Sequence, residues 1–355
     1  MAASGSSSSL LHALVGDEEI GAFFEKDAEL LAMLRTEEAL ALAEAQVGLI
    51  GQDAAACIVE VCRTFQPDWE RLARGLARDG VVVPEFVKQL RAAVGETHAE
   101  AVHLGATSQD IIDTGLILRL KAITEVFLRR LDGVIGALHG LKARDGSMPL
   151  MAHTRMQQAL PFTAADKINT WLQPLERQRE ALNELMPRLL VVQLGGPVGT
   201  RAELKGHGDA VADAMAERLG LGYAPQWHSQ RDRLGELGSW LSILSGSLGK
   251  IGQDVTLMAQ NEVGEVRLAT GGGSSAMPHK SNPVPAEVLV TLARFNAGLL
   301  GTLHQALVHE NERSGAAWTL EWLVLPQMAV AAGAGLNLAQ ALLSSLTFLR
   351  SGAAK

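Results

Sequence analysis

The chain has 355 residues, of which 47% are hydrophobic but only 4% aromatic, and its formal net charge at pH 7 is −8. A core of this size filled mainly by Leu, Val, Ile and Ala favours packed helices over a sheet sandwich, which draws more on aromatic and β-branched residues. The negative charge argues against a general nucleic-acid-binding or membrane-surface protein, because such partners are themselves anionic and would repel it. A local basic pocket for a small anion stays compatible with that charge.

The amino terminus and the two cysteines both indicate a cytoplasmic protein. Residues 1–14 lack the basic region followed by an apolar stretch that marks a signal peptide, so we expect a short disordered lead. Cys57 and Cys62 fall on one predicted helix, and a chain of this size needs no disulfide scaffold, so reduced thiols are expected. A zinc pair is the alternative, but no second Cys/His pair stands at matching spacing, and we expect no metal.

Helical patterns dominate the first half of the chain. Apolar residues fall near one face over 27–50, and Pro67 and Pro84 separate shorter helices that run to about residue 98. A long helix begins at Thr107, because the segment from Thr107 to Asp110 has the form of a capping box, in which a hydroxyl and an acidic side chain satisfy free backbone amides. The pattern therefore changes near residue 100 from short helices to long ones.

The second half of the chain predicts further long helices. A second capping box at Thr163 opens a helix that Pro187 closes, and apolar residues recur every three or four positions over about 231–262. Asn282 is expected to cap another helix, with Pro283 at its first position and an end near residue 309.

The last predicted helix, about 319–349, carries no charged residue between Glu321 and Arg350. Its proline, amides and many small residues fit a helix buried among other helices better than a membrane span, because small residues permit close backbone approach. Strand patterns are nearly absent, although 189–194 could be a short extended piece.

These elements predict an all-α fold, a bundle of long helices. Lone helices of this length would expose too much apolar surface, so a bundle shared between subunits is expected. We place an N-terminal helical domain at 1–102, a central long-helix bundle domain at 103–350 and a tail at 351–355.

Three polar segments, each just before a helix, are the candidate functional sites. In the first, 103–110, free amides at a helix start and the hydroxyls of Thr107 and Ser108 form a ready anion site, with ordinary helix capping as the alternative. The second, 153–161, combines a cation, an amide and a hydroxyl, and taken alone it reads as a polar loop. The third, 271–283, combines three glycines with two serines and a lysine.

The third segment matches two common loop motifs only in part. A phosphate loop needs a glycine before the lysine, but His279 stands before Lys280, and no strand precedes the segment. A nucleophile elbow needs a second glycine two residues after its serine, where Met277 stands. The string Gly-Ser-Ser-Ala-Met-Pro-His-Lys-Ser-Asn-Pro at 273–283 instead resembles the signature loop of the fumarase/aspartase superfamily.

The resemblance to this superfamily covers about residues 20–350, because the first two polar segments also resemble its other active-site regions, in the right order. It implies a homotetramer around a central bundle of long helices, with each active site built from three subunits and no metal or organic cofactor. Members commonly carry another helical domain after the bundle, which we expect this chain to lack. The implied partner is a small carboxylate substrate, and neither a nucleic acid nor a membrane.

By the same resemblance, Ser275 is the base that removes a proton next to a substrate carboxylate, and Lys280 holds that carboxylate as it takes up charge. A serine hydroxyl is a very weak acid, so its alkoxide needs strong local help from loop amides, an ammonium group and a helix start. His103 matches a histidine of related lyases and is a candidate catalytic or binding residue. The remaining substrate contacts that the resemblance implies are Thr107, Ser108, Gln157, Ser274, Met277 and Asn282.

One departure from the family pattern bears on the reaction. Many members read Thr-His-x-Gln in the second segment, where the histidine protonates a departing amine, but 154–157 reads Thr-Arg-Met-Gln. Loss of a general acid costs about 10²–10⁴-fold in rate, and Arg155 cannot replace it because a guanidinium stays protonated. A carboxylate leaving group, with a pKa of about 4, needs no proton. Arg155 therefore favours the muconate-lactonising branch of the superfamily and suits a tricarboxylate substrate.

That branch adds an internal carboxylate to a carbon–carbon double bond, which would turn 3-carboxymuconate into 4-carboxymuconolactone in protocatechuate breakdown, the β-ketoadipate pathway. The stretch 309–326 also resembles it, and there Arg313 is expected to contact a second carboxylate or to form a structural salt bridge. His153 is a candidate substitute acid, and His279 a loop-packing residue. The alternatives are an adenylosuccinate- or argininosuccinate-type lyase and a non-catalytic structural member of the superfamily.

Overall fold

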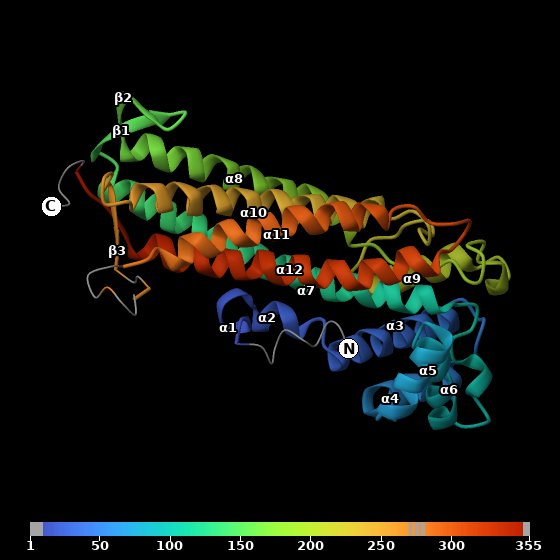
Figure 1. Cartoon of the computed structure of the whole chain (residues 1–355). Coiled ribbons are helices and arrows are strands. Elements are labelled where there is room, and N and C mark those ends of the chain that lie inside the picture. Colours follow the sequence, from blue (N-terminus) through green and yellow to red (C-terminus); the bar gives the residue numbers. More distant parts are fainter. Residues whose placement is uncertain (1–9, 270–271, 274–276, 278–280, 351–355) are drawn as a thin grey trace.

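Five long helices lie side by side in the computed structural model, which describes residues 10–269, 272–273, 277 and 281–350 (Figure 1). The predicted all-α bundle is confirmed. Its members are α7 (Ser108–Asp145), α8 (Ala164–Leu189), α10 (Asp232–Met258), α11 (Val284–Gln305) and α12 (Gly315–Ser345).

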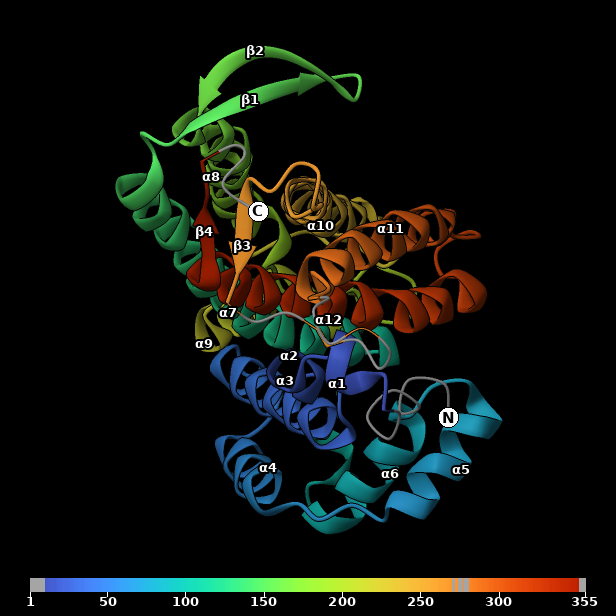
Figure 2. The same ribbon diagram turned by 60° about the vertical axis from the view of Figure 1, so that its left-hand side comes forward.

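Shorter helices gather beside the bundle (Figure 2). The longest of them, α3 (Lys26–Gln46), packs along α7 and also contacts α4 and α9, so the predicted division at residues 102 and 103 stays a prediction. The others are α1 (His12–Val15), α2 (Glu18–Ala22), α4 (Gln52–Thr64), α5 (Trp69–Asp79), α6 (Val83–Val94) and α9 (Gly208–Leu219), with short 3-10 turns η1 (Ala99–Ala101) and η2 (Ala202–Leu204).

Side-chain caps fix the starts of three of the long helices, α7, α8 and α12. Thr107 caps α7 and Thr163 caps α8, each in the reciprocal capping box that the sequence predicts. The start of α12 was predicted near residue 319, but it lies at Gly315, because the Ser314 hydroxyl accepts a backbone N–H of the first turn.

Two predictions about prolines are wrong. Pro187 lies inside α8, because residues that follow a proline still donate to carbonyls one turn back, as the N–H of Leu190 does to Met186. Pro283 is the N-cap of α11 and not its first residue, because its ψ of 53° lies outside the helical range.

The far ends of three long helices also differ from prediction. The expected ends near 262 and 309 are observed at Met258 for α10 and at Gln305 for α11. The helix expected to reach about 349 stops at Ser345, because the next three residues form β4 (Leu346–Phe348), which pairs antiparallel with β3 (Val266–Leu268).

The second polar segment is a β-hairpin, so its interpretation as a loop is wrong. β1 (Pro149–Thr154) pairs antiparallel with β2 (Gln157–Thr163), and most of both strands is exposed. Strands without a buried face show no alternation of apolar and polar residues, which explains why the sequence did not indicate them. The possible extended piece at 189–194 forms one bridge, from Val191 to Gly222.

The apolar helix α12 lies within the bundle, against α7, α10 and α11. Both α11 and α12 are long and apolar enough to span a membrane by composition, which core helices of soluble proteins often are. Within its most apolar window α12 is 61% buried inside the chain, whereas α11 is 33% buried. The predicted packing of the last helix among other helices is therefore observed, and α11 keeps an open face.

Both cysteines lie on α4 as free thiols, as predicted. Burial, reinforced by the nearby carboxylate of Glu37, raises the pKa of the Cys62 thiol to about 12, so this thiol stays protonated. Among the described residues, no three His, Cys, Asp or Glu side chains are grouped to hold a metal ion.

Candidate functional site

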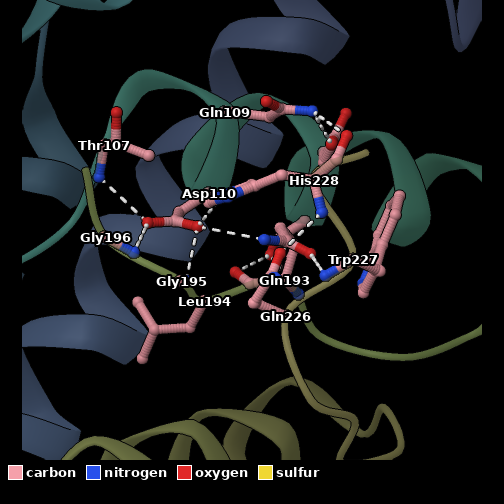
Figure 3. A network of polar contacts seen from close by, with 12 residues as sticks. Thr107, Gln109, Asp110, Gln193, Leu194, Gly195, Gly196, Gln226, Trp227 and His228 are labelled. Atoms are coloured by element: carbon pink, nitrogen blue, oxygen red, sulfur yellow. Dashed lines mark hydrogen bonds and ion pairs between the residues drawn. The ribbon is translucent and has the colours of Figure 1, made fainter. Parts of the chain in front are cut away.

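The first polar segment is fixed in place by one buried carboxylate, Asp110 (Figure 3). It accepts the backbone N–H of Thr107 at 3.0 Å, closing the cap of α7. It also accepts the N–H groups of Gly195 at 2.8 Å and Gly196 at 2.9 Å, and the Nε2–H of His228 at 2.8 Å. Asp110 therefore joins the start of α7 to two loops that lie far away in the sequence.

Arg313 completes this arrangement from the loop before α12. Its guanidinium donates to Oγ1 of Thr107 at 3.0 Å and to the carbonyl oxygens of Pro197 at 2.9 Å and Gly196 at 3.4 Å. The structure thus brings Arg313 to the first segment, as the substrate-binding prediction requires. None of these partners is a carboxylate, and the contact of Arg313 with a substrate carboxylate stays a prediction.

A positive charge beside the start of a helix suits an anion. The backbone amides at the start of α7 carry partial positive charge, and the guanidinium of Arg313 adds a full charge next to the Thr107 hydroxyl. The Nε of Arg313 is buried without a hydrogen-bond partner among the described residues. Thr107, Ser108 and Arg313 therefore lie together at the start of α7, and their binding of a substrate carboxylate stays a prediction.

His103 lies near this site and is bound to a carboxylate that the sequence analysis did not single out. Its Nδ1–H donates to Oε1 of Glu37 on α3 at 2.6 Å. Burial would lower the pKa of His103, but the charge and hydrogen bond of Glu37, helped by Asp110, outweigh burial and raise it. His103 therefore keeps its positive charge to a higher pH than an ordinary histidine.

A fully buried ion cluster lies one turn further along α7. Arg231, the N-cap of α10, donates to Asp113 at 2.6 and 3.1 Å and to Glu321 of α12 at 2.6 and 2.8 Å. The indole N–H of Trp318 also donates to Asp113 at 3.0 Å. This cluster joins three long helices beside the first polar segment, and none of its charged members was predicted as a site residue.

The hairpin carries Arg155 and Gln157 at its tip, away from the bundle (Figure 2). Arg155 and Met156 form its two-residue turn with φ values of 49° and 67°, a left-handed backbone that normally favours Gly or Asn. Two non-glycine residues in this conformation cost free energy, and such strain often marks functional sites. His153 lies in β1 and pairs with Gln158 of β2. Its role as a substitute acid stays a prediction.

The signature loop is described only in part. The predicted catalytic and binding residues Ser274, Ser275 and Lys280, together with His279, lie outside the described residues. Asn282 is not the N-cap of α11, because Pro283 holds that position. The backbone N–H and carbonyl of Asn282 pair with those of Gly272, at 2.8 and 2.9 Å. That pair closes the base of the loop, and Met277 between its ends is 42% exposed.

The first polar segment and the hairpin of the second lie at opposite ends of the bundle in one chain (Figure 1). The 38 residues of α7 separate its Thr107 cap from the hairpin by about 55 Å, at 1.5 Å per residue. The hairpin shares its end with the segment before the signature loop, because the N–H of Met151 donates to Glu265 at 3.2 Å. Thr107 and Arg313 therefore cannot meet Arg155 or Asn282 within one chain.

Comparisons with known proteins agree with this architecture. The family model described as lyase matches residues 10–297. The chain is 42% identical over 332 residues to the 3-carboxy-cis,cis-muconate cycloisomerase of Pseudomonas aeruginosa, covering 92% of this chain and 72% of that protein. It is 40% identical to the protein of the same name from Pseudomonas putida, with coverages of 89% and 77%. The crystal structure of the 3-carboxy-cis,cis-muconate lactonizing enzyme from Pseudomonas putida superposes with a TM-score of 0.89 at 39% identity, covering 96% of this chain and 77% of that chain.

Proposed function

This chain belongs to the lyase family, within the fumarase/aspartase superfamily, and we propose that it is a cycloisomerase that converts 3-carboxy-cis,cis-muconate into 4-carboxymuconolactone. The sequence identity to two 3-carboxy-cis,cis-muconate cycloisomerases supports this substrate assignment. It is 42% and 40%, over 92% and 89% of this chain. The same proposal places the protein in the cytoplasm and in the breakdown of protocatechuate.

Arg155 supports a reaction without an amine leaving group. In lactonisation, a substrate carboxylate oxygen forms a bond to one carbon of a double bond, and the electron pair moves to the neighbouring carbon, next to a second carboxylate. Ser275 would deliver the proton to that carbon, and in the reverse direction it would remove it. The leaving group of the reverse reaction is a carboxylate, which departs as a stable anion, so a guanidinium at position 155 costs nothing in proton transfer.

The charges of the substrate account for the cations of the site. Addition of an internal carboxylate places negative charge on a carbon next to another carboxylate, so fixed cations and amide donors there stabilise the transition state. Lys280 and Asn282 would hold this carboxylate. Thr107, Ser108 and Arg313 would bind a second carboxylate at the start of α7, and Arg155 and Gln157 a third.

A site of this composition needs more than one chain. The anion site and the hairpin lie at opposite ends of α7, and the hairpin tip projects away from its own bundle. Large apolar side chains are also exposed on neighbouring bundle helices, among them Ile243 of α10 and Phe295 of α11. A homotetramer with antiparallel bundles would cover these faces and bring the segments of different subunits together.

Mixed oligomers test the shared site. We expect Ser275→Ala and Arg313→Ala proteins each to be nearly inactive, because each removes one essential segment of every site. When both are coexpressed with different affinity tags and purified together, about a quarter of the sites combine two intact segments, so activity should return to about that fraction of wild type.

A matched control uses two variants of one segment. Coexpression of Ser275→Ala with Lys280→Ala should restore no activity, because both changes fall in the same loop and no mixed site is intact. Equal recovery of activity in the two mixtures would contradict a site shared between subunits in this way. So would the absence of recovered activity in both mixtures when the mixed oligomers are stable.

A direct assay tests the function itself. Purified protein should remove the ultraviolet absorbance of 3-carboxy-cis,cis-muconate, because lactonisation shortens the conjugated system, and should leave adenylosuccinate and argininosuccinate unchanged in parallel reactions. Cleavage of a carbon–nitrogen substrate with no effect on the muconate would sink the proposal in favour of the lyase alternative.

A further inference from the structure

The pair formed by Glu37 and His103 links the small helices to the anion site. Glu37 lies on the buried face of α3, and its side chain is 1% exposed. A buried carboxylate needs a partner that supplies charge and hydrogen bonds. In the part of the chain that the structure describes, the ion-pair partner of Glu37 is His103, with 2.6 Å between Oε1 and Nδ1.

A second buried carboxyl group lies on the same helix as Glu37. Glu44 lies two turns further along α3, where burial and the charge of Glu37 raise its pKa to about 9. It is therefore neutral near pH 7, and neither of its carboxyl oxygens has a hydrogen-bond partner among the described residues. Of these two carboxyl groups, Glu37 is the one that is hydrogen-bonded to His103.

The geometry of His103 leaves one ring nitrogen for a ligand. Nδ1 is bound to Glu37, while Nε2 has no hydrogen-bond partner among the described residues, and the side chain keeps 13% exposure. His103 has a φ of 62°, which a non-glycine residue keeps only where its surroundings hold it. The hydrogen bond to Glu37 is one such constraint. It holds His103 four residues before Thr107, the residue that caps α7.

Three charged groups from three helices face His103. They are Glu37 of α3, Asp110 of α7 and Arg91 of α6. The two carboxylates favour the imidazolium and the guanidinium opposes it, as burial does, with a net rise in the pKa of His103. Below that raised pKa both ring nitrogens carry protons, so His103 is a donor to anions and cannot act as a base.

We propose that Glu37 is a positioning residue that holds His103 as an imidazolium, whose Nε2–H binds a substrate carboxylate beside Thr107 and Arg313. This assignment rests on the proposed function for the identity of the substrate. His103 contacts the substrate, and Glu37 acts through His103 by fixing its charge and the orientation of its ring. The first polar segment thereby offers a carboxylate two cations and a helix start.

The Glu37→Gln variant separates charge from shape. Glutamine keeps an oxygen that accepts the Nδ1–H of His103 but removes the negative charge. In protein labelled with ¹³C-histidine, with the His103 signal identified from its loss in His103→Gln, we expect the NMR-detected pKa of His103 to fall by about 1–3 pH units.

The same variant should show a pH-dependent loss of substrate binding. Above its lowered His103 pKa, we expect KM for 3-carboxy-cis,cis-muconate to rise about tenfold relative to wild type, with a smaller change in kcat, because a charged hydrogen bond to the substrate is lost. Lowering the pH through that pKa should restore KM. Glu37→Asp, which keeps the carboxylate, should retain a raised His103 pKa.

The neighbouring carboxylate provides the matched control. Glu38 pairs with Arg63 near the surface at 3.4 Å, and Glu38→Gln should change neither the His103 titration nor KM. An unchanged His103 pKa in Glu37→Gln, or a lowered pKa without the pH-dependent KM, overturns the proposal. If Glu37→Gln does not fold, His103→Gln must still raise KM and abolish its pH dependence. Failure of the proposed function would appear as no turnover of the muconate by wild type. The NMR titration needs no substrate, so it tests the link between Glu37 and His103 separately from that function.

Discussion

Replacement of Ser275 by alanine is expected to lower kcat for lactonisation by about 10²–10⁴-fold, the range for loss of a positioned proton-transfer group. KM should change much less, because the cations and amides that hold the substrate carboxylates are untouched. Stopped-flow or steady-state measurement of the muconate absorbance, with purified Ser275→Ala and wild type at the same protein concentration, gives both constants.

A neighbouring hydroxyl of the same loop is the control for this prediction. Ser281 follows Lys280 and has no assigned role, so Ser281→Ala should keep kcat within a few fold of wild type while making a comparable change to the loop. Unchanged lactonisation by Ser275→Ala would show that Ser275 is not the proton-transfer group. Equal losses in the two variants would instead indicate a general disturbance of the loop.

Local chemistry made much of the fold predictable from the sequence. The capping boxes at Thr107 and Thr163 depend on residues three positions apart, and both helix starts are where the sequence predicts them. The periodic apolar residues of α10 likewise indicate its packed face. Helix ends were less predictable, because the end of α12 depends on strand pairing with residues near 267.

The hairpin shows what local patterns cannot indicate. Most residues of its strands are exposed within one chain, and its turn uses Arg155 and Met156 where a glycine or asparagine would have marked a turn. The proposed reason for this turn is a substrate in another subunit, and such a reason is invisible in the periodicity of one chain. The motif resemblance identified the segment, but it did not indicate a strand.

The site was predictable where residues carry a family motif and unpredictable where distant segments meet. Arg313 and Thr107 are 206 positions apart, and their contact depends on the way α12 packs against α7. Glu37 and Asp113 were not predicted, although the sequence carried a signal for both. Each is a charged residue at an otherwise buried position of a helix. A charge at such a position predicts a buried partner, and the partners are His103 and Arg231.

The buried cluster around Arg231 leads to the largest expected effect on stability. Arg231→Met removes the guanidinium that binds both Asp113 and Glu321, and leaves two carboxylates in a site without solvent access. We expect the free energy of unfolding to fall by about 3–5 kcal/mol, as is typical when one member of a buried ion cluster is removed. Denaturant unfolding at fixed protein concentration measures it, because the stability of an oligomer depends on concentration.

A surface arginine on the neighbouring helix provides the control. Arg188 pairs with Glu236 at 3.2 Å, but its side chain is 59% exposed, so Arg188→Met should cost at most about 1 kcal/mol. Burial already raises the pKa of Glu321 in the wild type, and loss of Arg231 should raise it further. A carboxyl group with a raised pKa in the folded state binds protons more tightly there than in the unfolded state, so the deficit of Arg231→Met should shrink as the pH falls. A deficit equal to that of Arg188→Met and constant with pH would show that the cluster is solvated and does not hold α7, α10 and α12 together.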